Sequence, residues 1–176
     1  MKRNIELKAR YPDLDAARRI AGEIGATLHS SERQRDTYFR CRSGRLKLRQ
    51  RWTDRGESSE LIGYERADAD RPRASDYSVV PVADAEALRA LLAAALGTAG
   101  EVDKRRTVYL YQNVRIHLDD VCGLGTFIEF EAVLDGSRSE EECNATLRTL
   151  VEAFRIAPGQ IVPVSYSDLP GQHRAR

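Results

Sequence analysis

Apolar residues recur with two different spacings along this chain, and each spacing predicts a different kind of element. Three segments place apolar residues at every third or fourth position, the spacing of an amphipathic helix. They are residues 12–25, 83–97 and 137–154. The first two end on a glycine, and the third opens with Ser137 and Glu140 at the spacing of a capping box. We expect the alanine- and leucine-rich second segment to be an amphipathic core helix.

Between these helices, apolar and polar residues alternate, which indicates strands with one buried face. The predicted strands are residues 2–10, 35–42, 45–53, 60–67, 75–82, 101–112, 113–120 and 126–134. Short turns are expected at 42–44, at 112–113 and at the "GLG" of residues 123–125. Consecutive paired strands indicate an antiparallel sheet and an α+β fold class. About eight such strands can close into a barrel.

We therefore predict an antiparallel eight-stranded β-barrel with flanking helices, formed by one domain over residues 1–170. The segment 66–75 is rich in Arg, Asp and Pro and is expected to be a mobile loop. Residues 171–176 are expected to be a disordered tail.

The polar faces of the predicted strands carry charges that are segregated by strand. Successive side chains of a strand point to opposite faces, so each charged residue can be assigned to a face. The bases that fall on polar faces are Lys8, Lys47, Arg49, Arg51, Lys104, Arg106 and Arg115. The acids are Glu6, Asp119, Glu129 and Glu131. A solvated face is the ordinary alternative, but it usually mixes both signs with neutral polar residues. The segregation favours a charged barrel interior that binds a ligand.

The residue types of this face point to one kind of ligand. Lys and Arg bind phosphate oxygens, and Arg often does so with two hydrogen bonds. Carboxylates two residues apart, such as Glu129 and Glu131, hold hard divalent cations such as Mg²⁺ or Mn²⁺. Many bases with a few carboxylates therefore indicate a polyanion bound together with a metal, and a triphosphate is the natural candidate.

Composition narrows the possible partners. The 176 residues include 28 Lys and Arg against 27 Asp and Glu, a formal net charge of +1, whereas nucleic-acid binders usually have a basic excess. No apolar run reaches the length of a membrane span, and the N-terminus lacks the apolar core of a signal peptide. The three widely spaced cysteines fit a reducing cytoplasm and form no zinc motif. We expect a cytoplasmic protein with neither a nucleic-acid nor a membrane partner.

Several short motifs together resemble one known family. "NIELK" at 4–8 resembles the ExExK motif that opens the CYTH superfamily, also called triphosphate tunnel metalloenzymes. The other matching pieces are "DTYF" at 36–39, "GRLKLRQR" at 44–51, "VDKRR" at 102–106, "RIHLDDVCGLGTFIEFE" at 115–131 and "SYSDL" at 165–169. The superfamily includes class IV adenylyl cyclases, thiamine triphosphatases and inorganic triphosphatases. The resemblance implies an eight-stranded tunnel that acts on ATP or tripolyphosphate with Mg²⁺ or Mn²⁺.

The resemblance also implies roles for individual residues. Those that resemble the family's metal ligands are Glu6, Glu129 and Glu131. Those that resemble its phosphate-binding bases are Lys8, Lys47, Arg49, Lys104, Arg106 and Arg115. Arg51 has the same strand parity but resembles the family's bases less closely. Asp119 resembles an acid near the metal or the attacking group, and we predict a catalytic set of Asp119, Lys8 and Arg106. His117 is either a proton carrier, a nucleobase contact or a structural histidine.

Two departures from the family pattern affect the choice of reaction. Asn4 stands where the first Glu of the motif is usual, and Glu65–Arg66 stand where many members have a phosphate-binding Lys. A class IV adenylyl cyclase, which converts ATP to cyclic AMP and pyrophosphate, is the leading hypothesis, because cyclisation needs no metal-activated water. The alternatives are a triphosphatase acting on inorganic, nucleoside or thiamine triphosphate, and a triphosphate-binding module that has lost catalysis. The sequence leaves the oligomeric state open, a homodimer included.

Overall fold

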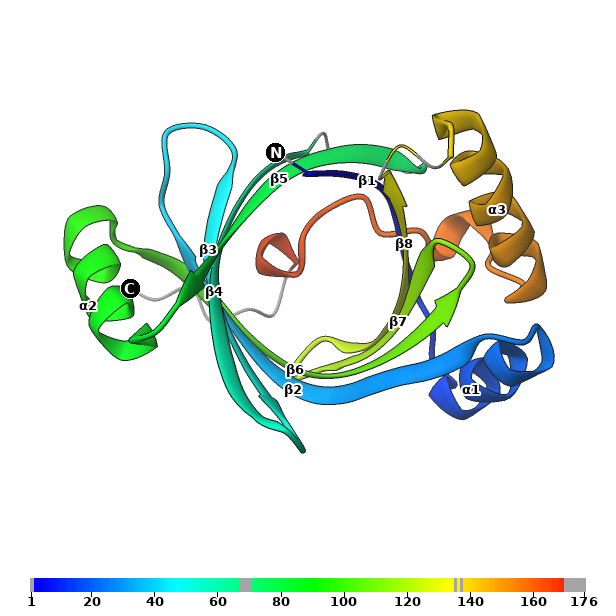
Figure 1. The fold of residues 1–176 in the computed structure, drawn as a ribbon, viewed down its shortest axis with the longest axis horizontal. Helices are drawn as coiled ribbons and strands as arrows, with labels where there is room; N and C mark the ends of the chain where they lie inside the picture. Colours follow the sequence, from blue (N-terminus) through cyan, green and yellow to red (C-terminus); the bar gives the residue numbers. More distant parts are fainter. Residues whose placement is uncertain (1, 67–70, 135, 137, 170–176) are drawn as a thin grey trace.

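The computed structural model describes residues 2–66, 71–134, 136 and 138–169, and within them eight strands close into an antiparallel barrel (Figure 1). The strands are β1 (Lys2–Arg10), β2 (Thr27–Phe39), β3 (Arg45–Thr53), β4 (Gly56–Arg66), β5 (Arg73–Val82), β6 (Thr98–Tyr111), β7 (Val114–Val121) and β8 (Gly125–Leu134). Their order around the barrel is β1-β5-β4-β3-β2-β6-β7-β8. The helices are α1 (Leu14–Glu23), α2 (Ala85–Leu96) and α3 (Glu140–Ala153), with 3₁₀ turns η1 (Pro158–Gln160) and η2 (Tyr166–Asp168). The predicted barrel is confirmed.

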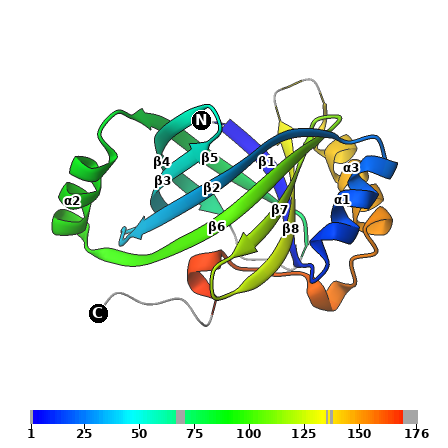
Figure 2. The same cartoon turned by 90° about the horizontal axis from the view of Figure 1, so that it is seen from below.

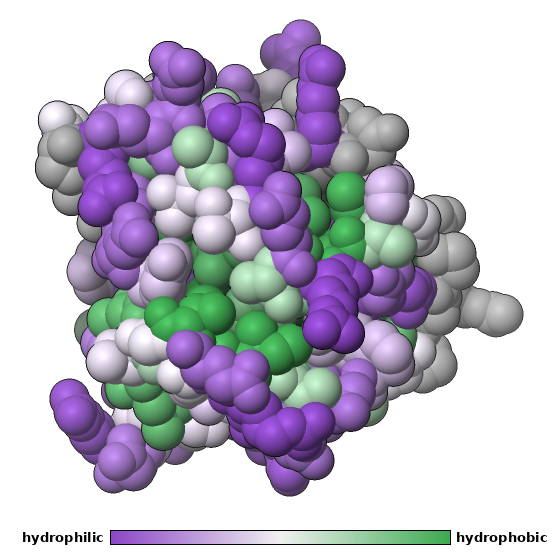
Figure 3. Space-filling view, turned by 90° about the vertical axis from the view of Figure 1, so that its right-hand side faces the viewer, coloured by the Kyte–Doolittle hydropathy of each residue, from purple (hydrophilic) through white to green (hydrophobic). Residues whose placement is uncertain are grey.

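The main hydrophobic core lies outside the ring of strands. Helices α1 and α3 cover the outer face of β1, β7 and β8 (Figures 1 and 2). The strand residues of this core are Ile5, Leu7, Ala9, Val114, Ile116, Leu118, Ile128, Phe130 and Ala132. Seen from the helix side, the outward surface is largely polar, and apolar residues show between the polar ones (Figure 3). Because alternate side chains point in opposite directions, the charged positions of the same strands point into the barrel, as predicted.

Local signals in the sequence set the ends of the helices. Asp13 caps α1 by accepting a hydrogen bond from the backbone N–H of Ala16, at 2.8 Å. The capping box of α3 lies two residues later than predicted: the Ser139 hydroxyl accepts from the backbone N–H of Glu142 at 3.1 Å, and the Glu142 carboxylate accepts from the backbone N–H of Ser139 at 2.7 Å. The predicted capping residue Ser137 lies outside the described residues.

Within residues 83–97 the predicted helix is present, but the prediction that this helix belongs to the core is wrong. The helix forms as α2, between the cap Asp84 and Gly97, whose φ of 77° ends it. It stands at the edge of the molecule near β2 and β3 (Figure 1), and none of its residues is buried. Leu91 is 64% exposed. Periodicity identifies an apolar stripe, but it does not show whether another element covers that stripe. None of the described helices is long and apolar enough to cross a membrane.

Strand β2 begins eight residues before its predicted start. Apart from the exposed Leu28, its first half, "TLHSSERQ", is polar on both faces, so the alternation that marks a strand is missing there. Strand β5 begins at Arg73, inside the predicted loop 66–75. Residues 67–70 of that loop and the predicted tail at 171–176 lie outside the described residues. The turns at 112–113 and 123–125 form as predicted, with a φ of 53° at Gln112.

Candidate functional site

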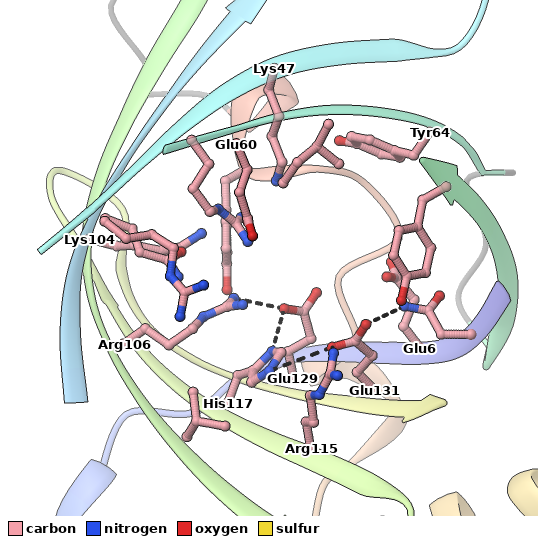
Figure 4. Close-up of a pocket in the computed structure, with 18 of the residues that line it drawn as sticks. Glu6, Lys47, Glu60, Tyr64, Lys104, Arg106, Arg115, His117, Glu129 and Glu131 are labelled. Atoms are coloured by element: carbon pink, nitrogen blue, oxygen red, sulfur yellow. Dashed lines mark hydrogen bonds and ion pairs between the residues drawn. The ribbon is translucent and has the colours of Figure 1, made fainter. Parts of the chain in front are cut away.

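The barrel encloses a cavity of about 410 Å³, lined by side chains from all eight strands and from η2 (Figure 4). Among the described residues, seven bases and five glutamates line it. The bases are Lys8, Lys47, Arg49, Arg51, Lys104, Arg106 and Arg115. The glutamates are Glu6, Glu32, Glu60, Glu129 and Glu131. Every base that the sequence assigned to the interior therefore lines the cavity, as do three of the four predicted acids. The fourth, Asp119, lies behind the lining.

One cluster of bases surrounds Asp36, which has no exposed surface. Arg49 donates two hydrogen bonds to the Asp36 carboxylate, both at 2.7 Å, and the Nζ atoms of Lys47 and Lys104 lie 3.0 and 3.4 Å from Asp36 Oδ2. Burial alone would raise the pKa of Asp36, but Arg49, Lys104 and Lys47 together hold it well below its ordinary value. Burial lowers the pKa of Lys47 to about 7 and that of Lys104 to about 8. Asp36 thus fixes three phosphate-binding candidates in place.

A second acid of β2, Glu32, holds Arg51 of β3. The guanidinium of Arg51 donates to Glu32 Oε2 at 2.7 and 3.1 Å, and Gln34 also donates to the Glu32 carboxylate. Neither Glu32 nor Asp36 is among the site residues predicted from the sequence. Asp36 could have been found, because it shares strand parity with Tyr38 in the quoted "DTYF". Glu32 gave no such signal, because the predicted strand began three residues after it.

The second cluster is built around Arg106. Its guanidinium forms a two-pronged pair with Asp119 at 2.6 and 2.7 Å and reaches Glu129 Oε2 at 2.8 Å. The Tyr166 hydroxyl donates to Asp119 Oδ2 at 2.8 Å. Burial would raise the pKa of Asp119, but Arg106 lowers it to about 2. Asp119 is completely buried, and both of its oxygens are paired, so in this structure it orients Arg106. Its place near the metal or the attacking group stays a prediction.

The carboxylates of β8 lie beside the first motif of the chain. In the pairing of β1 with β8, Glu6 is opposite Glu131 and Lys8 is opposite Glu129. Lys8 Nζ lies 3.8 Å from Glu129 Oε1. His117 lies between the two β8 carboxylates, with Nδ1 3.2 Å from Glu129 Oε2 and Nε2 3.7 Å from Glu131 Oε2. His117 is therefore part of the cavity wall, a position that the sequence left open.

The donors of this corner fit a hard divalent cation. Glu6, Glu129 and Glu131 supply carboxylate oxygens, the ligands that Mg²⁺ and Mn²⁺ prefer. Asn4 Nδ2 donates to Glu131 Oε1 at 2.5 Å, and Asn4 Oδ1 is buried without a hydrogen-bond partner. In the described part of the chain, no three acidic, His or Cys groups already converge as a metal cluster. The carboxylates would have to exchange their present partners for the cation.

The end of the barrel beneath Asp119 is filled by an apolar cluster. Its strand members have the same parity as the cavity-lining residues and so point inward. The buried members are Tyr38, Val102, Val121, Leu124, Phe127, Val162 and Tyr166. The segment that carries η2 crosses the interior of the ring (Figure 1), and Tyr166 packs edge-on against Phe127 with ring centroids 4.9 Å apart. Lys8 Nζ lies 4.0 Å from the centroid of the Tyr166 ring. This cluster forms the floor of the cavity.

The remaining departure from the family pattern is at the end of β4. Glu65 is exposed and so does not face the cavity, and the side chain of Arg66 lies outside the described residues. On the inner face of β4, the described cavity-lining residues are Glu60, Ile62 and Tyr64, none of them a base.

Comparison with known proteins agrees with this geometry. The family model of the CYTH domain matches residues 2–166. The chain belongs to the CYTH family. As a member of this family it has a fold that binds triphosphate substrates, and CYTH enzymes of this tunnel type generally depend on divalent metals. A comparison with curated proteins found no match.

Three solved CYTH-like structures illustrate the likeness. The PH1012 protein of Pyrococcus horikoshii OT3 is 25% identical, with a TM-score of 0.81 over 96% of this chain and 99% of that one. A Vibrio parahaemolyticus protein, provisionally assigned as an adenylate cyclase, is 17% identical, with a TM-score of 0.75 over 94% of this chain and 95% of that one. A Hippeastrum protein, provisionally assigned as an adenylyl cyclase and described as revealing a dominant triphosphatase activity, is 13% identical, with a TM-score of 0.63 over 96% and 93%.

Proposed function

We propose that this CYTH protein is a divalent-metal-dependent enzyme that converts ATP to cyclic AMP and pyrophosphate. The observation that carries the proposal is the presence of two opposed groups in one cavity. Carboxylates of β1 and β8 lie on one side, Lys47 of β3 and Lys104 of β6 lie on the other, and Arg106 of β6 reaches from that side to Glu129 (Figure 4). This arrangement suits a polyphosphate whose oxygens contact bases at one end and a cation at the other.

The charge of the cavity supports a requirement for metal. Seven bases and five glutamates line it, and Asp36 and Asp119 lie directly behind the lining, so the described acids match the bases in number. This differs from the excess of bases over acids that the sequence suggested, and the described side chains need no bound anion to balance their charges. A triphosphate brings several negative charges into a balanced cavity. A divalent cation that enters with it would restore part of the balance.

The bases have distinct parts in the proposed reaction. The ribose 3′-hydroxyl of ATP forms a bond to the α-phosphorus, the bond from that phosphorus to the pyrophosphate oxygen breaks, and the hydroxyl proton passes to solvent. Lys47, Arg49 and Lys104 would bind the phosphates, and Arg106 would stabilise charge that develops on the leaving pyrophosphate. Arg106 enters this role already oriented by Asp119. When bound by Glu6, Glu129 and Glu131, the cation would polarise phosphate oxygens.

Asn4 favours cyclisation over hydrolysis. Its amide donates to Glu131 at a position where a carboxylate would add a ligand for a second cation. Activation of water by a metal is not needed when the nucleophile is a hydroxyl of the substrate itself. The second candidate is a triphosphatase, and it is supported by the activity described for the Hippeastrum protein of the same fold.

A product assay tests the proposal. Purified protein is incubated with ATP or tripolyphosphate and Mg²⁺ or Mn²⁺, and nucleotides, pyrophosphate and orthophosphate are separated. We expect cyclic AMP and pyrophosphate in equal amounts, and orthophosphate without cyclic AMP would establish the triphosphatase instead. Glu129→Ala should abolish turnover, whereas Glu57→Ala, at an exposed position of β4, should not change it. Tight triphosphate binding without turnover in any metal would identify the chain as a binding module that has lost catalysis.

A further inference from the structure

One wall of the cavity differs from the rest in having an apolar surface. On the inner faces of β4 and β5, four side chains form two cross-strand pairs: Ile62 is opposite Val79, and Tyr64 is opposite Tyr77. Directly opposite residues of antiparallel strands have Cβ atoms about 4.5–5.5 Å apart, so the four form one continuous patch. We call this patch the β4–β5 wall. Among the described side chains of these two strands, no Lys or Arg lines the cavity.

Neither of the two apolar clusters described above includes the aliphatic half of this wall, in which Ile62 is buried and Val79 is partly exposed. Ile62 and Val79 belong neither to the core under α1 and α3 nor to the apolar cluster at the floor. Both line the cavity, which is otherwise bounded largely by charged and polar groups. Apolar side chains that face a cavity commonly provide the surface on which the hydrophobic part of a ligand rests.

The wall adjoins both of the charged regions that the triphosphate proposal uses. Lys47 Nζ lies 5.5 Å from the centroid of the Tyr64 ring, at the edge of the Asp36 cluster. Along β5, Ser75 precedes the wall residue Tyr77 and pairs in register with Asn4 of β1, beside the carboxylate corner. In Figure 4, Tyr64 lies across the open space from Lys104 and Arg106. A group attached to bound phosphates could therefore reach the wall without leaving the cavity.

We infer that the β4–β5 wall binds an organic, ring-containing group attached to the triphosphate, and that the site consequently prefers organic triphosphates to inorganic tripolyphosphate. Tyrosine rings and branched aliphatic side chains offer a flat group both stacking and burial. Tripolyphosphate has only charged and polar oxygens and gains nothing from this surface. The volume of about 410 Å³ lies in the range of pockets that enclose a whole organic ligand. The inference rests on the proposed triphosphate substrate, but it is independent of whether the reaction is cyclisation or hydrolysis.

Adjacent residues of β5 provide a matched test. Val79 faces the cavity, whereas Val80 faces outward and is 56% exposed. Dissociation constants for tripolyphosphate, ATP and thiamine triphosphate would be measured by calorimetry with Ca²⁺, a cation that the same oxygen donors bind. We expect the wild type to bind at least one organic triphosphate about tenfold or more tightly than tripolyphosphate, because one apolar contact in a pocket is worth about that factor. Val79→Ser should remove most of this preference while leaving tripolyphosphate affinity unchanged, and Val80→Ser should change neither.

Each result that contradicts the expected binding preferences would overturn a different part of the proposal. Tripolyphosphate that binds the wild type as tightly as both organic compounds would overturn this inference alone and leave the triphosphate site standing. An organic preference that persists in a folded Val79→Ser protein would overturn the assignment to the wall. Absence of binding by all three compounds would overturn the proposed function together with the inference. The comparison of ligands on the wild type decides the preference even where the variant does not fold.

Discussion

Replacement of Asp36 by Asn tests how the buried bases are held. Asp36 is completely buried, and its carboxylate contacts Lys47, Arg49 and Lys104 at 2.7 to 3.4 Å. Asn has nearly the same shape, so the substitution removes one negative charge without opening a large cavity. The variant should therefore report on charge rather than on packing.

The expected loss of stability follows from how many of the three bases can lose a proton. Removal of one partner of a buried ion pair costs about 3–5 kcal/mol of unfolding free energy. The pKa values of Lys47 and Lys104 are already lowered to about 7 and about 8, so both can become neutral at little further cost near pH 7.5. Arg49 stays charged, because guanidinium groups do not deprotonate in proteins. We therefore expect the lower end, about 3 kcal/mol, or about 6–12 °C in Tm for a chain of this size.

Thermal and urea unfolding would measure this loss with and without saturating tripolyphosphate and Mg²⁺. Ligand oxygens can replace the missing carboxylate, so the deficit of the variant should shrink when ligand is present. Asp103→Asn is the matched control, since Asp103 contacts Arg33 and Arg35 on the outer face and is about one-third exposed. That change should cost no more than about 1 kcal/mol. An Asp36→Asn protein as stable as the wild type, or a deficit that ligand does not reduce, would refute the reasoning.

Four further predictions concern the same cavity. The affinity of the free protein for tripolyphosphate should fall as pH rises above 7, as Lys47 and then Lys104 lose their protons, and calorimetry in buffers of different ionisation enthalpy should detect proton uptake on binding. Up to their ordinary pKa of 10.5, the same two lysines bind more protons in the unfolded state than in the folded state. Their contribution to the free energy of unfolding should therefore rise with pH between 7 and 10.5. Urea midpoints that fall over this range would contradict the lowered pKa values. Asn4→Glu should increase Mn²⁺ affinity, measured by titration calorimetry, and lower the Tm of the metal-free protein, because a carboxylate would then face Glu131; unchanged metal affinity would exclude this position as a ligand. Lys8→Ala should weaken triphosphate binding about tenfold or more, since a buried charge-assisted contact is lost, and unchanged affinity would remove Lys8 from the site.

The barrel and its inside–outside assignment were predictable because strand parity is a local property. Alternation in segments such as "NIELKAR" fixed which residues face the helices, and the charges on the other face had to point inward once the sheet closed. The start of β2 was not predictable in this way, because both of its faces are polar there. The exposure of α2 depends on what lies beside it, which a periodic pattern does not contain.

The cavity-lining bases were predictable, but the acids that hold them were not. Lys47, Arg49 and Lys104 share the parity of strands that were correctly placed. Their common partner, Asp36, lies on a different strand, and its contact with all three depends on how β2 pairs with β3 and β6. The contacts of Asp119 were likewise not predicted: Arg106 and Tyr166 donate hydrogen bonds to its two carboxylate oxygens.

The location of the hydrophobic core has a consequence for how this family can vary. Because the core that packs α1 and α3 lies outside the ring of strands, substitutions inside the barrel leave that packing intact. Above the apolar floor, the charged interior residues are constrained by the sum of their charges, so we expect substitutions among them to covary in pairs of opposite sign. Asn4 is one such change: it removes a negative charge from the inner face of β1, and we expect it to be accompanied by the loss of a positive charge elsewhere in the interior. Neutral compensation of this kind would let one barrel change its substrate without first losing its fold.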